Sequence, residues 1–376
     1  MEKNKKNISA RKIVFHLNSL GLGGAEQVVT TLANYFVNQG DKIYIATEWV
    51  SQEEYKIDKR IERVHVGLTV EQEKVNSKIQ FFIRIKNLRD FIKRVHPDIV
   101  ISFAQAANYR AMMATQFLKT PVMISVRTDP YLNYTGFRDK VFIPLFLSKA
   151  AGSVFQTENA RNFFPSKLKK HSRIILNPIN DKYLNREKPQ KRREAVVHSG
   201  RLVDCKNQQL LIDAFLKVHQ RYPEYKLEIY GGNSEDGTEE ALQQSIMRNH
   251  ADNYIFLMGE SSNLEKQLID GAVYAFSSDW EGLPNALMEA MALGLPVVAT
   301  DCPCGGPRTL IQNGENGILV PVKNVDAMAE AIMLLIENKE LAEELGKNAR
   351  KISEIANSEA ICCQWREYIE ELCEHK

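Results

Sequence analysis

Two glutamates, Glu281 and Glu289, lie eight positions apart in a segment predicted to run from a strand through a loop into a helix. Residues 273–276 form the short apolar strand, and Glu281 follows in the loop at its carboxyl end. Glu289 lies about one and a half turns into the helix. Gly282 lets a ligand approach the backbone closely, and the free N–H groups at the helix start bind anions.

These groups together favour one kind of ligand. A carboxylate on each side of an anion site repels a bare phosphate, but it accepts hydrogen bonds from sugar hydroxyl groups. A nucleotide sugar offers that layout, because its ribose, diphosphate and hexose follow one another. The alternative is structural: one glutamate caps the helix and the other is solvated on its surface.

Further candidate residues follow three other predicted strands. Arg201 and Lys206 stand in residues 200–207, between a strand and a helix, where two fixed cations neutralise a diphosphate as it gains charge. An ordinary basic loop is the alternative. Tyr230-Gly231-Gly232 and Met258-Gly259-Glu260 end two more strands, and their glycines leave room for a flat base against the backbone.

The helix that carries Glu289 is bounded by recognisable signals. Residues 286–293 are good helix formers, and Pro284 suits the first helical position, where its missing N–H costs nothing. Gly294 suits the left-handed conformation that ends a helix. The buried strand 297–299 follows.

Strands and helices alternate in two blocks, which predicts two doubly wound parallel sheets. The first block has strands at 11–17, 42–47, 63–66, 98–103, 122–126, 152–156 and 173–176, and helices at 25–38, 78–95, 108–118 and 137–149. The second begins at residue 195, with helices at 207–221, 237–250, 263–270, 286–293, 325–337, 339–355 and 358–374. The charged stretch 181–194 reads as a linker.

Residues 277–300 resemble the Glu-x7-Glu motif of the family 4 retaining glycosyltransferases, which have the GT-B fold. The resemblance covers nearly the whole chain, because Gly23-Gly24-Ala25-Glu26, the 200–207 loop and Gly305-Gly306-Pro307-Arg308 also fit the family in order and spacing. It implies an acceptor-binding domain at 1–180, a linker at 181–194, a nucleotide-sugar-binding domain at 195–357 and a last helix at 358–376 that packs on the first domain.

The resemblance also implies a role for each site residue. Arg201 and Lys206 bind the diphosphate, Glu281 the hydroxyls of the transferred sugar and Glu289 the ribose; Glu281, Arg201 and Lys206 are the predicted catalytic residues. The predicted donor site further includes Gly23, Gly24, Gly231, Gly259, Glu260, Gly282, Leu283, Pro284 and Asn285.

The predicted acceptor-side residues are Glu26, Asn108, Arg127 and Asp129. An Arg-x-Asp-Pro loop like residues 127–130 occurs in relatives acting on amino sugars and galactose-type sugars, although Asp129 followed by proline also starts ordinary turns. Many relatives carry a histidine after the fourth strand, where this chain has Gln105 and Asn108.

The activity implied by the resemblance is retaining transfer of a hexose or N-acetylhexosamine from a UDP-sugar to a glycan, lipid-linked in the leading hypothesis, in bacterial cell-surface polysaccharide assembly. In such transfer the leaving phosphate helps deprotonate the acceptor. No Asp-x-Asp motif is present, so no metal and no cofactor besides the donor is expected. A sugar-nucleotide epimerase on the same fold and a non-catalytic GT-B partner subunit are the alternatives.

Composition excludes several other classes. The 376 residues carry a net charge of +2, which excludes a generally basic nucleic-acid binder. The six cysteines lack zinc-finger spacing, and idle thiols fit a reducing cytoplasm. No run reaches the ~18 apolar residues of a spanning helix. The basic segment 1–12 mimics a signal peptide, but His16 and Asn18 interrupt the apolar run and favour a first strand.

Two predicted helices, 78–95 and 137–149, combine apolar and basic residues. Either they pack on the core with a solvated basic face, or they contact a membrane surface. The second interpretation predicts a cytoplasmic protein that visits the inner face of the cell membrane.

Overall fold

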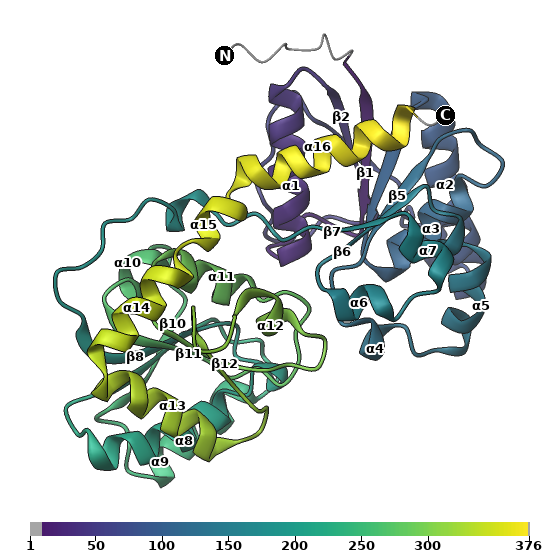
Figure 1. Ribbon diagram of the computed structural model, residues 1–376. Helices are drawn as coiled ribbons and strands as arrows, with labels where there is room; N and C mark the ends of the chain where they lie inside the picture. Colours follow the sequence, from purple (N-terminus) through teal and green to yellow (C-terminus); the bar gives the residue numbers. More distant parts are fainter. Residues whose placement is uncertain (1–9, 375–376) are drawn as a thin grey trace, which may run out of the picture. The chain divides into compact units, whose positions relative to one another are not determined.

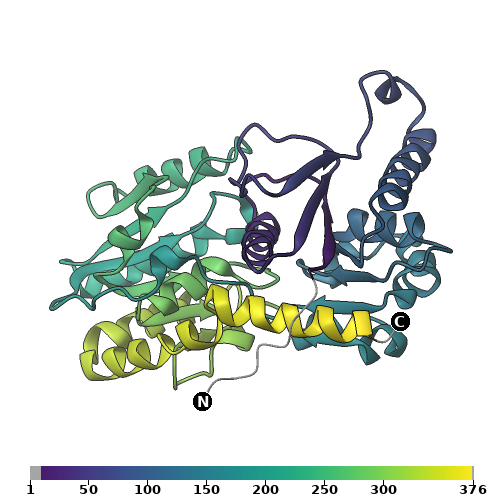
Figure 2. The same ribbon diagram turned by 90° about the horizontal axis from the view of Figure 1, so that it is seen from above.

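The computed structural model describes residues 10–374 of the chain, which form two compact units. Unit 1 contains the described residues up to Pro178 and from Ile361 onward, and unit 2 contains Ile179–Ala360. In each unit helices lie on both sides of a parallel sheet (Figures 1 and 2). Residues 1–9 of the predicted basic segment lie outside the described residues, and the apolar run after them forms the first strand, as predicted.

Seven parallel strands form the sheet of unit 1 in the order β3-β2-β1-β4-β5-β6-β7. The central strand β4, Ile99–Phe103, is entirely buried, as expected for a sheet covered on both faces. The other strands are β1 (Lys12–Leu17), β2 (Lys42–Thr47), β3 (Glu62–His65), β5 (Val122–Ser125), β6 (Gly152–Phe155) and β7 (Ser172–Ile174).

The four helices predicted for unit 1 are present, two of them with clearly different bounds, and the structure adds short helices that were not predicted. The predicted helix 137–149 divides at Phe146, two residues after Pro144, which has no N–H to donate to the helix. The predicted helix 108–118 begins and ends earlier, as α3. The helices are α1 (Gly24–Asn38), η1 (Gln72–Lys74), α2 (Ser77–Val95), α3 (Gln105–Ala114), α4 (Pro130–Asn133), α5 (Phe137–Leu145), η2 (Leu147–Lys149), α6 (Glu158–Asn162) and α7 (Ser166–Lys170).

The last helix, α16 (Ser358–Glu374), packs along unit 1 from Ile361 onward, where Figure 1 shows it in yellow beside α1. Trp365 has no exposed surface and stacks on Phe103 of β4, with ring centroids 5.7 Å apart. The Tyr368 hydroxyl accepts from the Ser153 amide at 3.1 Å and donates to the His171 carbonyl at 2.8 Å. The chain end therefore completes the core of unit 1.

Unit 2 has a six-stranded parallel sheet in the order β10-β9-β8-β11-β12-β13. Its strands are β8 (Arg193–Ser199), β9 (Lys226–Tyr230), β10 (Ile255–Gly259), β11 (Gly271–Phe276), β12 (Val297–Thr300) and β13 (Ile318–Val320). Its helices are η3 (Asp181–Tyr183), η4 (Asp204–Lys206), α8 (Gln208–Arg221), α9 (Thr238–Arg248), α10 (Leu264–Leu268), α11 (Asn285–Ala292), α12 (Gly306–Leu310), α13 (Val325–Glu337), α14 (Lys339–Ala349) and α15 (Ile352–Ile355). The two parallel sheets confirm the predicted fold class.

The strand order reverses between β1 and β4 in unit 1 and between β8 and β11 in unit 2. In open α/β sheets, ligands bind beyond the carboxyl ends of the strands at such a switch point. The loops after β8 and β11 are the two loops that carry Arg201, Lys206 and Glu281.

The two ends of unit 2 lie side by side. The Ile179 amide donates to the Ala356 carbonyl at 2.8 Å, and the Ser358 hydroxyl lies 3.3 Å from a carboxylate oxygen of Asp181. The chain therefore enters and leaves unit 2 at one place.

Among residues 10–374, no helix combines the length and the hydropathy that crossing a bilayer requires.

Candidate active site

Two loops of unit 2 meet at the switch point and are tied together by hydrogen bonds. The Asp279 amide donates to the Cys205 carbonyl, and the Ser277 hydroxyl donates to the Lys206 carbonyl, each at 2.9 Å. Asn207 has φ +45° and caps α8 through its side-chain oxygen, while its amide nitrogen donates to Asp279 at 2.9 Å. These bonds fix the position of the loop after β11 relative to the loop after β8.

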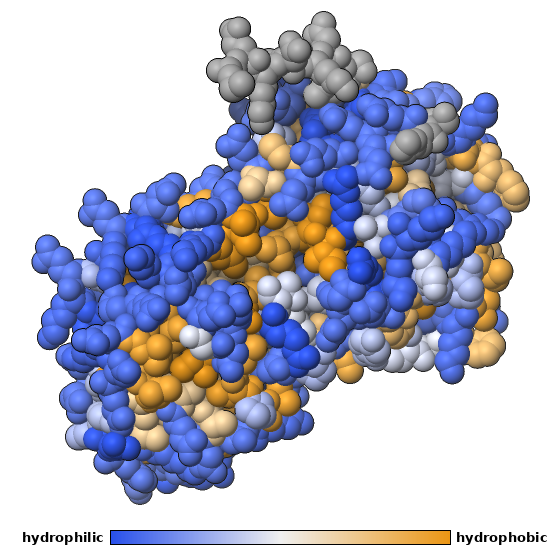
Figure 3. All heavy atoms as spheres, in the orientation of Figure 1, coloured by the Kyte–Doolittle hydropathy of each residue, from blue (hydrophilic) through white to orange (hydrophobic). Residues whose placement is uncertain are grey.

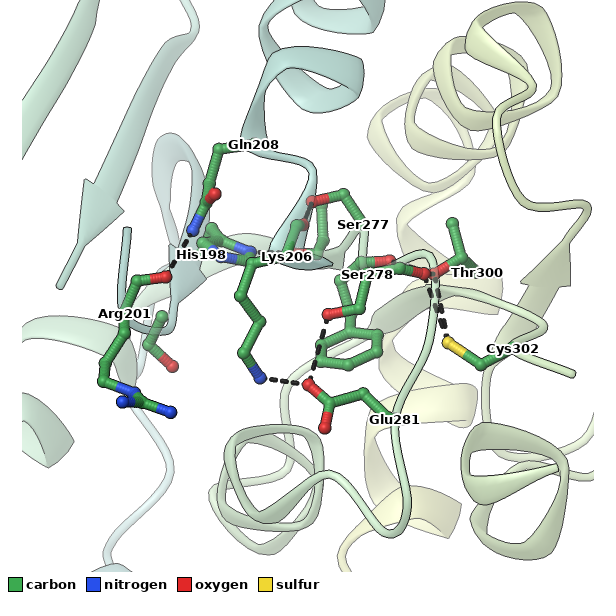
Figure 4. Close-up of polar contacts among 12 residues, drawn as sticks. His198, Arg201, Lys206, Gln208, Ser277, Ser278, Glu281, Thr300 and Cys302 are labelled. Carbon is green, nitrogen blue, oxygen red and sulfur yellow. Dashed lines mark hydrogen bonds and ion pairs between the residues drawn. The ribbon is translucent and has the colours of Figure 1, made fainter. Parts of the chain in front are cut away.

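Lys206 and Glu281 form an ion pair across these loops (Figure 4). The Ser278 hydroxyl also lies 3.4 Å from the paired oxygen of Glu281, and the Lys206 ammonium lies 5.7 Å from the centre of the Phe276 ring. The side chains of Lys206 and Glu281 are 17% and 18% exposed, so both can be reached from solvent. A solvent-accessible cation and a solvent-accessible carboxylate therefore stand side by side.

Arg201 extends from the same loop as Lys206 (Figure 4). The Gln208 side-chain amide donates to the Arg201 carbonyl at 2.9 Å and so holds the backbone. The exposed guanidinium has no hydrogen-bond or ion-pair partner among the described residues. It is thus available to an anion beside the Lys206–Glu281 pair.

Glu289 lies on α11, in the second turn of the helix that follows Glu281. Burial raises the pKa of Glu289 to about 7, and the nearby Lys182 ammonium and a hydrogen bond from the Tyr183 hydroxyl act in the opposite direction. Both partners come from η3, at the start of unit 2. The Glu289 carboxyl therefore changes charge near neutral pH.

The loop between the glutamates is closely packed. Pro284 is the N-cap of α11 and not, as predicted, its first helical residue, a place taken by Asn285. A side chain on Gly306 would lie 2.0 Å from the Gly282 carbonyl, so only glycine fits against this loop. Leu283 is buried, while Gly282 is partly exposed and can present its backbone to a ligand.

The predicted base-binding glycines divide into two kinds. A side chain on Gly231 would lie 1.9 Å from the Gly200 carbonyl, so this glycine is required for packing between two strand ends. Gly259 has φ +69° and open space where a side chain would lie. Glu260 is exposed, with its carboxylate over Gly232.

Two buried groups beneath the site were not predicted as functional. His198 has no exposed surface, its Nδ1 donates to the Ala275 carbonyl at 2.8 Å, and its pKa is lowered to about 4, chiefly by burial. The Tyr274 hydroxyl lies 3.2 Å from the Ser199 hydroxyl. These contacts support the loop after β8 from below, and His198 is a core residue of unit 2.

Gly23, Gly24 and Glu26 lie at the start of α1 in unit 1. Gly23 is the N-cap, Gly24 is the first helical residue, and both are accessible. The Glu26 carboxylate folds back over Gly23, and burial raises the pKa of Glu26. These three residues remain predicted contacts.

The other predicted acceptor-side residues are committed to the structure of unit 1. Asn108 has no exposed surface, and its amide donates to the Ser125 carbonyl at 3.0 Å. Asp129 is 3% exposed and caps α4 by accepting from the Tyr131 amide at 2.9 Å. We therefore remove both from the acceptor side.

Arg127 is enclosed by aromatic rings. Its guanidinium lies 5.2 Å from the ring centre of Phe103 and 5.4 Å from that of Trp365, and it donates to Asn177 at 2.7 Å. Burial lowers the pKa of Arg127 to about 9. We therefore remove Arg127 too, because it links β4, the loop after β5 and α16.

A buried ionic network at the carboxyl ends of β1 and β2 was also missed. The Glu48 carboxylate is 0% exposed and lies 2.8 Å from the Arg110 guanidinium and 2.5 Å from that of Arg84. Arg110 also donates to Asn18 at 2.6 Å. Hydrophobic periodicity in the sequence does not indicate such a network.

In the described part of the chain, no three His, Cys, Asp or Glu side chains gather as a metal site requires.

Two family models match the chain. The model described as glycosyl transferases group 1 matches residues 180–352, and the one described as glycosyltransferase family 4 matches residues 22–182. The chain belongs to the glycosyltransferases. The matched residues of this glycosyltransferase include the loops after β8 and β11 and the glycine segment at α1.

Similar proteins include bacterial glycosyltransferases. An uncharacterized glycosyltransferase of Haemophilus influenzae is 24% identical over 95% of this chain and 99% of its own length. A Campylobacter jejuni N-acetylgalactosaminyltransferase, named for a diphospho-undecaprenol-linked substrate, is 27% identical over 90% of this chain and 94% of its own length. Other curated relatives align over only 19% to 61% of their own length.

A solved structure confirms the fold of this glycosyltransferase. A protein of Anabaena, crystallised with UDP and glucose, superposes with a TM-score of 0.79 and 18% identity over 96% of this chain and all of that chain. With the two parallel-sheet units, this likeness shows the GT-B fold that the sequence resemblance implied.

Proposed function

We propose that this glycosyltransferase transfers a hexose or an N-acetylhexosamine from a UDP-sugar to a glycan, with retention at the anomeric carbon. The observation that carries the proposal is the Lys206–Glu281 pair, with Glu289 on the following helix and, beside the pair, the Arg201 guanidinium, which has no partner within residues 10–374. Cations for a diphosphate and two carboxylates for hydroxyl groups match the order of groups in a nucleotide sugar. Catalysis is assigned to Arg201, Lys206 and Glu281.

The names of similar proteins support the choice of substrates. The Anabaena structure contains UDP and glucose, and the Campylobacter relative is named as an N-acetylgalactosaminyltransferase acting on a diphospho-undecaprenol-linked glycan. We infer that the donor is a UDP-sugar bound by unit 2. We infer likewise that unit 1 binds the glycan acceptor, and that the acceptor is lipid-linked.

In the proposed step, the bond between the anomeric carbon and the β-phosphate oxygen breaks as the acceptor oxygen bonds to that carbon. The acceptor proton passes to the leaving phosphate, and UDP is released. Arg201 and Lys206 stabilise the negative charge that develops on the diphosphate, which is the largest demand of this transition state. Glu281 accepts hydrogen bonds from the transferred sugar.

Release of UDP from a panel of UDP-sugars, measured with and without a glycan acceptor, tests the proposal. We expect acceptor-dependent UDP release for one donor. Conversion of the donor without acceptor would instead indicate an epimerase, and binding of no nucleotide sugar would indicate a non-catalytic subunit. Proton NMR of the first product formed distinguishes retention from inversion.

We further propose that unit 1 contacts a membrane surface, where a lipid-linked acceptor would be found. Phe82 of α2 and Phe137 of α5 are 68% and 83% exposed, and lysines and arginines flank both. Hydrophobic side chains also reach the surface along the edge of unit 1 on which α5 lies (Figure 3). Each cation near an anionic surface contributes about 1 kcal/mol, and exposed aromatic rings add apolar contact.

Co-sedimentation with vesicles tests the membrane contact. Binding should rise with the fraction of anionic lipid and fall with salt, and Phe82→Ser with Phe137→Ser should weaken it. Met258→Ser is the matched control, because Met258 is an exposed apolar residue of unit 2. Equal sedimentation with neutral and anionic vesicles would contradict the proposal.

A further inference from the structure

Trp49 lies at the carboxyl edge of the sheet of unit 1, with its side chain partly in solvent. It is the second residue after β2 and is 46% exposed, whereas Glu48 before it is buried. Val50 and, in the loop after β1, Leu22 are exposed as well. Exposed apolar side chains that gather at one edge of a protein mark a binding surface more often than a single exposed side chain does.

The loop that carries Trp49 is hydrogen-bonded to the loop after β1, which borders the switch point of unit 1. The Trp49 amide donates to the Asn18 carbonyl at 3.1 Å, and the Tyr55 amide donates to the Leu20 carbonyl at 3.0 Å. The Asn18 side chain in turn accepts from Arg110 of α3, the helix that follows β4. Trp49 is therefore tied to the place between β1 and β4 where an open α/β sheet binds ligands.

The backbone around Trp49 is held on both sides. A side chain on Gly67 would lie 1.8 Å from the Glu48 carbonyl, so the chain before Trp49 is closely packed. Arg63 of β3 donates to the Trp49 carbonyl at 3.3 Å and to the Glu54 carboxylate at 2.8 Å. An aromatic ring on a fixed backbone loses little conformational entropy when a ligand packs against it.

The groups around Trp49 suit a neutral ligand that is rich in hydroxyls. Residues 49–55 contain two glutamates and no lysine or arginine, unlike α2 and α5, where cations flank the exposed phenylalanines. Gln52 and Glu53 are exposed. An indole packs against the C–H face of a sugar ring, and amide and carboxylate groups bind its hydroxyls. Within residues 10–374 the Trp49 ring stacks on no other ring and pairs with no cation, so it is available to such a ligand.

We propose that Trp49 is a binding residue for the glycan acceptor, one of whose sugar rings stacks on the exposed indole. The inference rests on the proposed function, in which unit 1 binds the acceptor. Trp49 supplies a contact that Asn108, Arg127 and Asp129, which are committed to the fold of unit 1, do not supply. A contact made equally before and during transfer changes KM for the acceptor and leaves kcat unchanged.

Fluorine NMR of the protein labelled with 5-fluorotryptophan tests the contact without catalysis. The chain has three tryptophans, Trp49, Trp280 in unit 2 and the fully buried Trp365, and the signals can be assigned with single Trp→Phe variants. The probes are the methyl glycosides of glucose, galactose, N-acetylglucosamine and N-acetylgalactosamine at millimolar concentrations. We expect at least one of them to shift the Trp49 signal and none to shift the Trp365 signal.

Two results of this experiment would contradict the proposal. The first is a Trp49 signal that none of the four glycosides moves. The second is a Trp49 signal that moves with phosphatidylglycerol vesicles and with no glycoside, which would make Trp49 a membrane contact instead of a sugar contact.

Kinetics separate a failure of this proposal from a failure of the proposed function. Trp49→Ala should raise KM about tenfold for the glycan that supports UDP release, with kcat and UDP affinity unchanged. Trp49→Phe keeps an aromatic face and should stay within about threefold of wild type. Phe117→Ala is the matched control and should keep the wild-type KM, because Phe117 is an exposed ring before β5, at the amino edge of the same sheet.

The two failures have different signatures. A wild-type KM in Trp49→Ala would overturn the role of Trp49 and leave the proposed function standing. Absence of acceptor-dependent UDP release in the wild type would overturn the proposed function, and with it the acceptor role of Trp49, whatever the fluorine signals show.

Discussion

The two units gather charged residues at the carboxyl edge of their sheets but use them differently. At the switch point of unit 2, Lys206 and Glu281 are solvent-accessible and the Arg201 guanidinium has no partner among the described residues. At the carboxyl ends of β1 and β2 in unit 1, Glu48 is enclosed by Arg84 and Arg110. In both units charged side chains lie at the carboxyl edge of a parallel sheet. Those that are solvent-accessible are available to a ligand, whereas those that are buried pair with one another and hold the fold.

The largest expected effect is a loss of enzyme turnover when a charged residue at the switch point of unit 2 is removed. Arg201→Ala or Lys206→Ala should lower kcat by roughly 10²- to 10³-fold, because each removes a charge that stabilises the departing diphosphate. Initial rates of UDP release at saturating donor measure the effect. Arg221→Ala, which removes an exposed arginine of unit 2, is the matched control and should retain activity. An unchanged kcat in both site variants would contradict the proposal that the charges at the switch point of unit 2 act on a bound ligand.

The second difference is in stability. Arg110→Ala leaves the fully buried Glu48 carboxylate with one arginine fewer, and the loss should lower the unfolding free energy of unit 1 by about 3 kcal/mol. Glu281→Ala breaks a partly exposed pair and should cost about 1 kcal/mol or less. Urea denaturation followed by Trp fluorescence measures both. Equal losses would show that the two charge clusters are not energetically distinct.

A third test uses the buried histidines, one in each unit. Burial is the main cause that lowers the pKa of His16 to about 3 and that of His198 to about 4. Above pH 6.5 these histidines are neutral in both the native and the unfolded protein. Below pH 6.5 they take up protons in the unfolded chain but not in the native protein, so the unfolding free energy decreases as the pH is lowered. At pH 5 each histidine should account for a loss of about 2 kcal/mol.

The measurement is the change in unfolding free energy between pH 7 and pH 5. His198→Gln should reduce this change by about 2 kcal/mol relative to wild type. His171→Gln removes an exposed histidine and should not. If both variants behaved as wild type, burial of His198 would have no effect on its titration.

The smallest expected effects distinguish the two glutamates within unit 2. Glu281→Gln should lower kcat roughly tenfold and leave UDP affinity nearly unchanged, because UDP carries no hexose. Glu289→Gln should raise KM for the donor roughly tenfold and weaken UDP binding. Steady-state kinetics with calorimetry measure the two. Loss of UDP binding in Glu281→Gln alone would reverse the assignment.

The fold could be predicted because alternation of strands and helices is a local signal. Gly294 has the left-handed conformation expected at the end of α11, with φ +75°. The errors were local too: α5 ends near Pro144, and Pro284 precedes α11 instead of beginning it. Such boundaries depend on a few hydrogen bonds that side chains and prolines redistribute.

The sequence indicated which candidate side chains lie together only where a strand end supplied them. The loops of Lys206 and Glu281 follow strands that become neighbours once the strand order reverses. Arg127 was misassigned because its partner Trp365 lies at the far end of the chain. Likewise Tyr183 stands in the predicted linker, and nothing local indicates that it influences the pKa of Glu289.

The chain enters unit 2 at Ile179 and leaves it after Ala360, close to the hydrogen bond between Ile179 and Ala356, and this connectivity has an evolutionary consequence. Unit 2 is one continuous stretch of sequence whose entry and exit are joined by a hydrogen bond, so it has the connectivity of a cassette inserted into unit 1. Exchange of the whole cassette by recombination would require only two neighbouring junctions and would disturb no strand pairing in either sheet. Under the proposed function, in which unit 2 binds the donor and unit 1 the acceptor, such an exchange would give a lineage a new sugar donor without rebuilding the surface that recognises the acceptor.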